Sequence, residues 1–408
     1  MRILHTADWH LGDRLGRIDR TTDLRRAVER IGAYCRDEAV DVLLVAGDLF
    51  SELARPDGLR ETIEHWQTVF RDFLAGGGTI LTLTGNHDNE NFCRTLTHAM
   101  NLAAPTTGEM GEVVPPGRLY LATEPTLLRL SDRRDAFDVQ FLLMPYPTPT
   151  RYLRDEAQKY VSPEEKNARL MTAFVEALRT IQRHPRFDRR APAVLGAHVS
   201  VTGANIGRGL FRLEERDDVV VDAGEFQQDF AYVALGHIHK AQALGGREHV
   251  RYSGSIERMD LGEADDSKSV VVFDLGPAGL VGEPRVLPLA ATPVYEIGVY
   301  NPATDLPELK ERYPDARDDL VSLHVTYTAG TDSLEAVLRE LETIFPRWYA
   351  RDWKETGALG PAITPGEPAK GKSFEETVRD YVRTELMNHT DAEQAEVLQR
   401  LEALFAGE

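Results

Sequence analysis

The chain has 408 residues, enough for two or three domains, and its 47 basic against 66 acidic residues give a formal net charge of −19. That balance argues against a protein that holds nucleic acid through an overall basic surface, but it leaves open an enzyme that supplies cations locally. A polar start, two cysteines and no apolar run of the roughly 18–20 residues that cross a bilayer predict a cytoplasmic protein without a signal peptide, a disulfide framework or a membrane segment.

Short apolar runs rich in valine, isoleucine and leucine recur along the first two thirds of the chain, and such runs predict buried strands. Helical patterns at 21–38 and 56–75 separate the early runs. This β-α-β-α beginning predicts an α/β domain whose strands are buried on both faces. The predicted strands are RILHTADWH (2–10), DVLLVAGD (41–48), TILTLTGNHD (79–88), FDVQFLLMPYP (137–147), APAVLGAHVS (191–200) and FAYVALGHIH (230–239).

The composition changes after about residue 285, where two further strand patterns and a helix pattern predict a small separate α+β domain at 286–350. The segment 351–373 is rich in glycine and proline and predicts a linker. Capping boxes and an apolar stripe predict two helices within 374–408. The main domain then covers residues 1–285.

Polar side chains follow the predicted strands, and strands of an α/β sheet deliver such side chains to a common edge. Asp8 and His10 are two residues apart, as are His237 and His239, so on extended backbone each pair points to one side. The whole set of candidate site residues is Asp8, His10, Asp48, Asn86, His87, Asp88, His198, His237 and His239.

Carboxylate, amide and imidazole donors together suit divalent ions such as manganese, iron or zinc, whereas the absence of a thiolate disfavours a structural zinc site. Without His87 and Asp88, the set holds seven donors. Seven donors are too many for one ion but fit two ions about 3.5–4 Å apart that share a carboxylate. Such a pair would keep excess positive charge and attract an anion, for which a phosphodiester is the obvious candidate. A lone Asp-x-His motif or a lone buried histidine would be weak evidence for a metal site. The prediction of two metal ions rests on the whole ordered set of motifs.

The order DxH, GD, GNHD, H and GHxH is similar to the signature of the calcineurin-like metallophosphoesterases. MRILHTADWHLG at the start, and ALGHIHK followed by YSGSIERMD, resemble the SbcD nuclease branch, the catalytic subunits of the SbcC–SbcD DNA-repair complex. The stretch GDLFSELARP lacks the Asp-Arg-Gly of the protein phosphatases, and Ser51 stands where some nucleases of the family carry a histidine. The resemblance implies a β-sandwich flanked by helices, with 286–350 as a capping domain that shapes DNA access.

The resemblance also implies two Mn²⁺ ions, and the sequence leaves Mg²⁺, iron and Zn²⁺ open. Asp48 would bridge the ions. His87 would contact the phosphate and protonate the departing oxygen, and Asp88 would orient His87; the alternative for Asp88 is a turn residue that accepts backbone N–H groups. One ion would take Asp8, His10, Asp48 and His239, and the other Asp48, Asn86, His198 and His237.

By the same resemblance, the protein would be a 3′–5′ exonuclease on duplex DNA and an endonuclease on single strands and hairpins, acting in double-strand break repair. Its partners would be DNA, a second copy bound through helices near 56–75 and 92–103, and an SbcC-type ATPase docked on 374–408, in a nucleoid-associated heterotetramer. Two alternatives remain: a phosphatase or phosphodiesterase with a non-DNA substrate, and a scaffold without catalysis. Arginines in RLGRIDR (14–20) and NIGRGLFR (205–212) would contact DNA or be solvated surface.

Overall fold

The computed structural model describes residues 1–153, 160–207, 218–226, 230–356, 397 and 400. Apart from residues 397 and 400, the helices predicted within 374–408 lie outside these residues, as do most of the predicted linker and the second half of NIGRGLFR. Residues Met1–Thr356 form one compact unit. Across the described residues, no helix combines the length and apolar character needed to cross a membrane.

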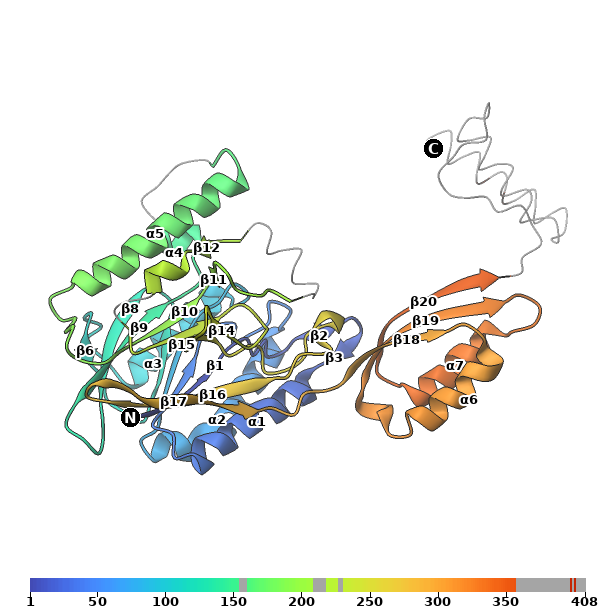
Figure 1. Ribbon diagram of the computed structural model, residues 1–408, viewed down its shortest axis with the longest axis horizontal. Helices are drawn as coiled ribbons and strands as arrows, with labels where there is room; N and C mark the ends of the chain where they lie inside the picture. The colour runs from blue at the N-terminus through green and yellow to red at the C-terminus, as the bar shows by residue number, and fades with distance from the viewer. Residues whose placement is uncertain (154–159, 208–217, 227–229, 357–396, 398–399, 401–408) are drawn as a thin grey trace. The chain divides into compact units, whose positions relative to one another are not determined.

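Two β-sheets stacked face to face form the body of this unit (Figure 1). The first has the order β17-β16-β1-β4-β5-β7, in which β1, β4, β5 and β7 are parallel and β16 and β17 are antiparallel to their neighbours. Its strands are β1 (Arg2–Thr6), β4 (Val42–Val45), β5 (Thr79–Leu83), β7 (Leu119–Ala122), β16 (Ser269–Gly276) and β17 (Gly279–Pro288).

The second sheet has the order β14-β15-β13-β10-β9-β8-β6, and its central strands β9, β10, β13 and β15 are parallel. Two short ladders lie outside the sheets: β2 (Arg14–Leu15) with β3 (Ile18–Asp19), and β11 (Ser200–Val201) with β12 (Val220–Val221). The strands of the second sheet are β6 (Glu112–Val113), β8 (Thr126–Ser131), β9 (Asp138–Met144), β10 (Ala193–His198), β13 (Tyr232–Gly236), β14 (Gln242–Leu244) and β15 (Arg247–Tyr252).

Helices cover the outer face of each of the two sheets, so the sandwich and its helices form four layers (Figure 1). One apolar cluster fills the space between the sheets, a second joins the first sheet to its helices, and a third joins the second sheet to its own. The predicted β-sandwich flanked by helices is confirmed. The helices are α1 (Thr21–Asp37), α2 (Pro56–Ala75) and α3 (Glu90–Ala103) on the first sheet, and α4 (Pro149–Tyr152) and α5 (Pro163–Arg183) on the second.

A three-stranded parallel sheet, β18-β19-β20, has its own apolar core beneath two helices; we call it the small module. Its elements are β18 (Val294–Val299), α6 (Pro302–Arg312), β19 (Leu320–Thr328), α7 (Leu334–Ile344) and β20 (Trp348–Thr356), with short 3-10 turns at Ala316–Asp318 here and at Ala223–Phe226 and Leu261–Glu263 in the sandwich.

The strand β20 corrects the expected boundary between the small domain and the linker. Residues 351–356, which the sequence analysis assigned to the linker, pair in parallel with β19. The strand lies at the edge of its sheet, where charged side chains are common, and most of its residues are exposed. It therefore lacks the apolar pattern that predicts a buried strand. The helix α6 was also not predicted.

The hairpin of β2 and β3 joins the small module to the sandwich. Arg17 donates from Nε to the Trp348 carbonyl (3.0 Å) and from Nη2 to the Pro346 carbonyl (3.1 Å), and its guanidinium lies 3.8 Å from the centre of the Trp348 ring. Arg20 is fully buried and pairs with Asp23 (2.7 Å) and Glu257 (2.8 Å). Arg20 is therefore structural, because neither expected role describes a buried side chain, whereas Arg17 links the hairpin to the small module with a side chain that is 45% exposed.

The apolar residues of α2 pack inward. Trp66 and Phe70 are buried in the core cluster beneath α1 and α2, and Ile63, Val69 and Phe73 pack against the same cluster. These apolar side chains therefore belong to the internal core.

Replacing Leu143, which is fully buried between the two sheets, by alanine will reduce the free energy of unfolding by about 2–5 kcal/mol, because the contacts are lost and a cavity remains. The matched control Leu102→Ala removes a side chain that is 86% exposed and will change it by less than about 0.5 kcal/mol. Urea denaturation measures both values. Equal effects of the two substitutions would contradict the assigned core.

Candidate metal centre

The candidate side chains leave five parallel strands where those strands end. Asp8 and His10 follow β1, Asp48 follows β4, and Asn86 follows β5, all in the first sheet. His198 ends β10, and His237 and His239 follow β13, in the second sheet. The structure therefore brings together side chains from both layers of the sandwich, as expected for ligand sites at the carboxyl ends of parallel strands.

The backbone at the site is not extended, which corrects the expectation that Asp8 and His10, or His237 and His239, point the same way as strand residues. The φ angles are +53° at Asp8, +44° at His10, +50° at Asp48 and +98° at His237. Among the described residues, Ala39 alone shares this conformation without being glycine or belonging to the site. Such residues cost about 1–3 kcal/mol each and concentrate at functional sites.

Two glycines make room for this crowding. A Cβ atom on Gly47, whose φ is +94°, would lie 2.2 Å from Nδ1 of His198. A Cβ atom on Gly236 would lie 2.0 Å from the Ala46 carbonyl oxygen. Neither distance is compatible with a side chain, so the loops after β4 and β13 can approach His198 only with glycine at these positions.

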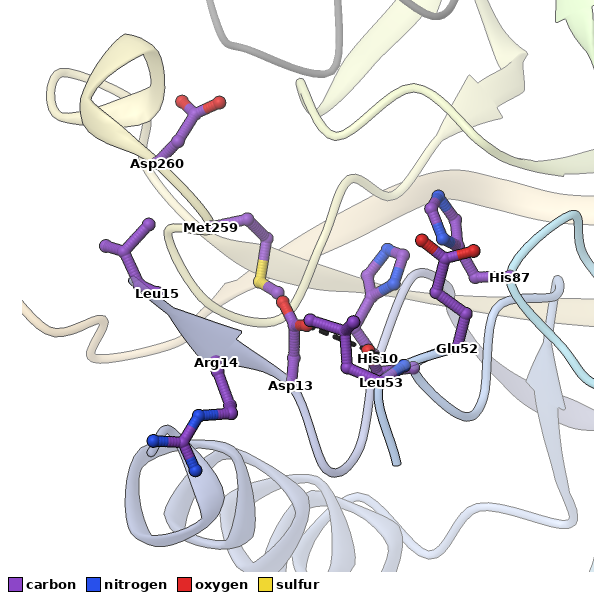
Figure 2. Close-up of a pocket in the computed structure, with 10 residues that line it drawn as sticks. His10, Asp13, Arg14, Leu15, Glu52, Leu53, His87, Met259 and Asp260 are labelled. Carbon is purple, nitrogen blue, oxygen red and sulfur yellow. Dashed lines mark hydrogen bonds between the residues drawn. The ribbon is translucent and has the colours of Figure 1, made fainter. Parts of the chain in front are cut away.

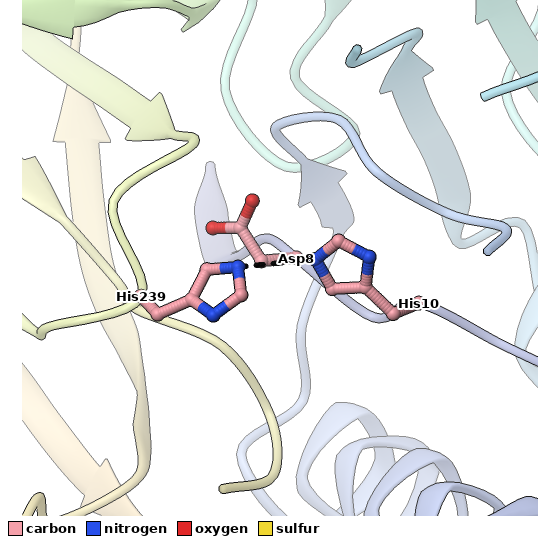
Figure 3. A group of neighbouring side chains, drawn as sticks. All are labelled: Asp8, His10 and His239. Atoms are coloured by element: carbon pink, nitrogen blue, oxygen red, sulfur yellow. Dashed lines mark hydrogen bonds between the residues drawn. The ribbon is translucent and has the colours of Figure 1, made fainter. Parts of the chain in front are cut away.

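Asp8, His10 and His239 form one group of inward-facing donors (Figure 3). The Nε2 atoms of His10 and His239 lie 3.1 Å apart, and ligand atoms of all three residues lie within 4.8 Å of one another. The three side chains are almost completely shielded from solvent. An oxygen and two nitrogens that converge this closely can share one cation.

Asp48 lies between that group and a second one. Its Oδ2 atom is 3.7 Å from Nε2 of His10 on one side and 3.2 Å from Nε2 of His198 on the other. The Asn86 Oδ1 atom is 3.0 Å from both Nε2 of His198 and Nδ1 of His237. Carboxylate, amide and imidazole donors without thiolate fit divalent cations of the manganese, iron or zinc type.

The charges of the two groups are tightly linked. Burial opposes the charged form of His198, but the Asp48 carboxylate beside it raises the pKa of His198 to about 9. Burial likewise opposes protonation of His239, and the Glu263 carboxylate raises its pKa to about 9. Burial disfavours the charged form of Asp48, yet His198 holds the pKa of Asp48 well below its usual value. Protons therefore supply the positive charge that these carboxylates require.

The model of the calcineurin-like phosphoesterase family matches residues 1–241, more than half of the chain. Among curated proteins, the chain is 28% identical over 322 residues to the SbcD component of the SbcCD nuclease of Bacillus subtilis, covering 78% of this chain and 76% of that one. It is 32% identical over 307 residues to the same component from Rhodobacter capsulatus, covering 71% and 69%. The chain belongs to the SbcD branch of the calcineurin-like phosphoesterases. The corresponding protein of Escherichia coli K12 is 28% identical over 297 residues, covering 68% and 66%.

In this SbcD-family chain, Asp88 bonds to the backbone of the loops around it. Its carboxylate accepts backbone N–H groups from Gly85 (2.8 Å), Phe50 (2.9 Å) and Leu49 (3.3 Å). These bonds hold the loop after β5 against the loop after β4, so the structure agrees with the alternative of a turn residue. Burial raises the pKa of Asp88 to about 7.

His87 lies beside the donors of the site. Its ring centre is 5.0 Å from that of His10, and its backbone N–H donates to Oδ1 of Asp48 (2.9 Å). A His87 ring nitrogen also falls within the 4.8 Å grouping of potential ligand atoms that includes His10 and Asp48. The His87 ring is therefore within reach both of the donor groups and of the cavity beside them.

A cavity of about 240 Å³ opens next to His10 and His87 (Figure 2). Ser51 faces its wall: the hydroxyl donates to Asp13 Oδ1 (2.8 Å) and accepts from the Leu53 N–H (3.1 Å). Ser51 thus stabilises the wall. The cavity is lined by His10, Asp13, Arg14, Leu15, Ser51, Glu52, Leu53, His87, Met259 and Asp260.

Sequence reasoning did not find two carboxylates that touch the site histidines. Asp218 lies 2.6 Å from Nε2 of His237, and Glu263 lies 2.7 Å from Nδ1 of His239. Neither belongs to a motif at a strand end, so only the fold shows their position.

The metal-free protein will lose stability as the pH rises from 6.5 to about 9. His198 and His239 bind protons more tightly when folded, since their pKa values rise from 6.5 to about 9. Their contribution is complete below pH 6.5, where both states are protonated, and is lost once the folded state deprotonates. Urea unfolding of chelator-treated protein at several pH values measures this slope.

The variant His239→Asn serves as the control, because it cannot bind the extra proton and will show a shallower slope. Stability of the metal-free wild type that rises across this pH range would refute the assignment.

Proposed function

We propose that this chain is a metal-dependent nuclease that hydrolyses phosphodiester bonds of DNA. The observation that carries the proposal is the convergence of carboxylate, amide and imidazole donors from five strand ends into two adjoining groups. The family match and the nuclease names of the relatives support it.

Two divalent ions, Mn²⁺ in our proposal, would occupy these groups. Asp48 would bridge them, in keeping with its place between His10 and His198. Divalent ions at such a site polarise the phosphate and lower the pKa of water. One ion would be held by Asp8, His10, Asp48 and His239, and the other by Asp48, Asn86, His198 and His237.

His87 would act on the phosphodiester from the cavity side. It shares the cavity wall with His10, so a phosphate placed against the donors would meet its ring. An imidazole in that place can donate a proton to the departing oxygen. Asp88 would contribute indirectly, by holding the loop that carries Asn86 and His87.

Recognition of DNA would be local, because a net charge of −19 repels a polyanion over the surface as a whole. The small module and Arg14, which lines the cavity, are the parts of the described chain that we propose to shape access. In the cytoplasm, near the nucleoid, the substrates would be duplex ends for 3′–5′ exonuclease action and single strands or hairpins for endonuclease action, in double-strand break repair.

The relatives carry names that place them in an SbcCD complex. We propose that this chain likewise works with an SbcC-type ATPase, through residues 374–408, as two copies of each protein. The residues for this contact lie outside the described part of the chain.

His87→Ala will retain both ions and lose about 10²–10⁴-fold in cleavage rate, because a positioned general acid contributes about that much. Metal content by elemental analysis and cleavage of hairpin DNA measure the two effects. The matched control is His65→Ala, which removes a histidine of α2 that pairs with Glu29 of α1. Loss of an ion from His87→Ala would instead make His87 a ligand.

The purified protein with Mn²⁺ will cleave both bis(p-nitrophenyl) phosphate and hairpin DNA, and a chelator will abolish both activities. Cleavage of the small ester alone would favour a phosphodiesterase with another substrate. Two bound ions without cleavage of either compound would favour a scaffold that has lost catalysis.

A further inference from the structure

The two histidines of the GHIH motif turn opposite ring nitrogens toward the site. His237 directs Nδ1 at Asn86 Oδ1 (3.0 Å), whereas His239 directs Nε2 at Nε2 of His10 (3.1 Å). Their outward nitrogens each meet a carboxylate: Nε2 of His237 donates to Asp218 (2.6 Å), and Nδ1 of His239 donates to Glu263 (2.7 Å). Two histidines that look equivalent in the motif are therefore placed in different orientations by their surroundings.

A carboxylate on one nitrogen decides what the other nitrogen can do. A neutral imidazole carries one N–H and one lone pair, and a fixed acceptor keeps the proton on its own side. The lone pair is then held on the inward nitrogen, which is the form that binds a cation. Asp218 thus favours a Nδ1 lone pair on His237, and Glu263 favours a Nε2 lone pair on His239.

Asp218 is itself held rigidly. It accepts from the Tyr146 hydroxyl at Oδ1 (2.7 Å) and from the Ser200 hydroxyl at Oδ2 (2.6 Å), and its side chain is 3% exposed. The Tyr146 ring also packs against His237, with ring centres 5.4 Å apart. The carboxylate and the imidazole therefore cannot move independently of each other.

Glu263 is held by a different set of groups. It accepts from Lys268 Nζ (2.6 Å), from the Met259 N–H (3.1 Å) and from the Ser255 hydroxyl (3.2 Å), all at Oε2. Its Oε1 atom remains directed at His239. Lys268 balances the buried charge, so the carboxylate can stay ionised where solvent is excluded.

We propose that Asp218 and Glu263 are positioning residues, each of which fixes the tautomer and ring orientation of one metal-binding histidine. Asp218 serves the ion at His237, and Glu263 serves the ion at His239. The two residues thus tune separate halves of the centre. The inference rests on the proposed metal function and extends it to residues outside the ligand set.

Asp218→Ala will weaken the binding of one Mn²⁺ ion by about 10- to 100-fold and leave the other ion within a few-fold of wild type. Asp218→Asn, which keeps an acceptor oxygen, will recover part of the loss. Isothermal titration of the full chain with Mn²⁺ resolves the two binding steps. The control Glu225→Gln removes one negative charge that pairs with Arg179 at the surface, and it will bind both ions normally.

Glu263→Gln will weaken the other binding step by a similar factor. Because this change leaves the buried Lys268 with only a more distant carboxylate, that of Asp266 at 3.9 Å, the double variant Glu263→Gln/Lys268→Met is prepared in parallel, and it too will lose that step. Asp218 and Glu263 variants that weaken the same step, or neither step, would overturn the inference.

The tautomers can be read in the wild type, without any variant. In protein labelled with ¹⁵N-histidine and loaded with Zn²⁺, long-range ¹H–¹⁵N spectra will show the remaining N–H on Nε2 of His237 and on Nδ1 of His239. The same nitrogen protonated in both residues would overturn the inference. A wild type that binds two ions with these tautomers but cleaves no DNA would overturn the proposed function alone.

Discussion

Hydrogen bonds between the loops after β1 and β4 are the constraint on which the centre depends. The N–H groups of Asp8, Trp9 and His10 donate to the carbonyls of Gly47 and Asp48, at 3.1, 2.8 and 3.0 Å. These bonds hold backbone conformations that an isolated loop would avoid. Trp9 anchors the first loop: its buried ring contacts those of Trp66 and Phe70, so it packs in the core.

The close packing of these two loops also brings buried charges together. Asp8 and Asp48 are buried together, and the burial of Asp8 raises its pKa whereas His198 lowers the pKa of Asp48. Two neighbouring carboxylates without solvent need positive charge close by. In the metal-free protein, protonated histidines supply it. Divalent ions bound in the proposed way would take over that charge, so metal loading and proton release would be coupled.

The sequence predicts the buried strands well, because the central strands are buried on both faces and therefore strongly apolar, whereas their arrangement as a sandwich was implied by the family resemblance. It also predicts which polar residues gather, since glycine-containing motifs at strand ends mark the edge of a parallel sheet. It fails where an interaction joins distant segments. Asp218 and Glu263 lie in no motif, the bond from the Phe50 N–H to Asp88 follows from no pattern, and β20 is an edge strand without an apolar pattern. The φ angles of Asp8 and His10 are positive, so the rule that strand residues two positions apart point to the same side does not apply to them.

The hairpin of β2 and β3 contacts both the cavity beside His10 and the small module. On one side, Arg14 and Leu15 form part of the cavity wall beside His10. On the other, Arg17 is clamped by the Trp348 ring and by two carbonyls of the small module, and a Cβ atom on Gly16 would lie 2.3 Å from the Tyr349 carbonyl oxygen. A shift of the small module would therefore also move the cavity wall formed by Arg14 and Leu15. A partner that binds the small module would in this way change which molecules can enter the cavity.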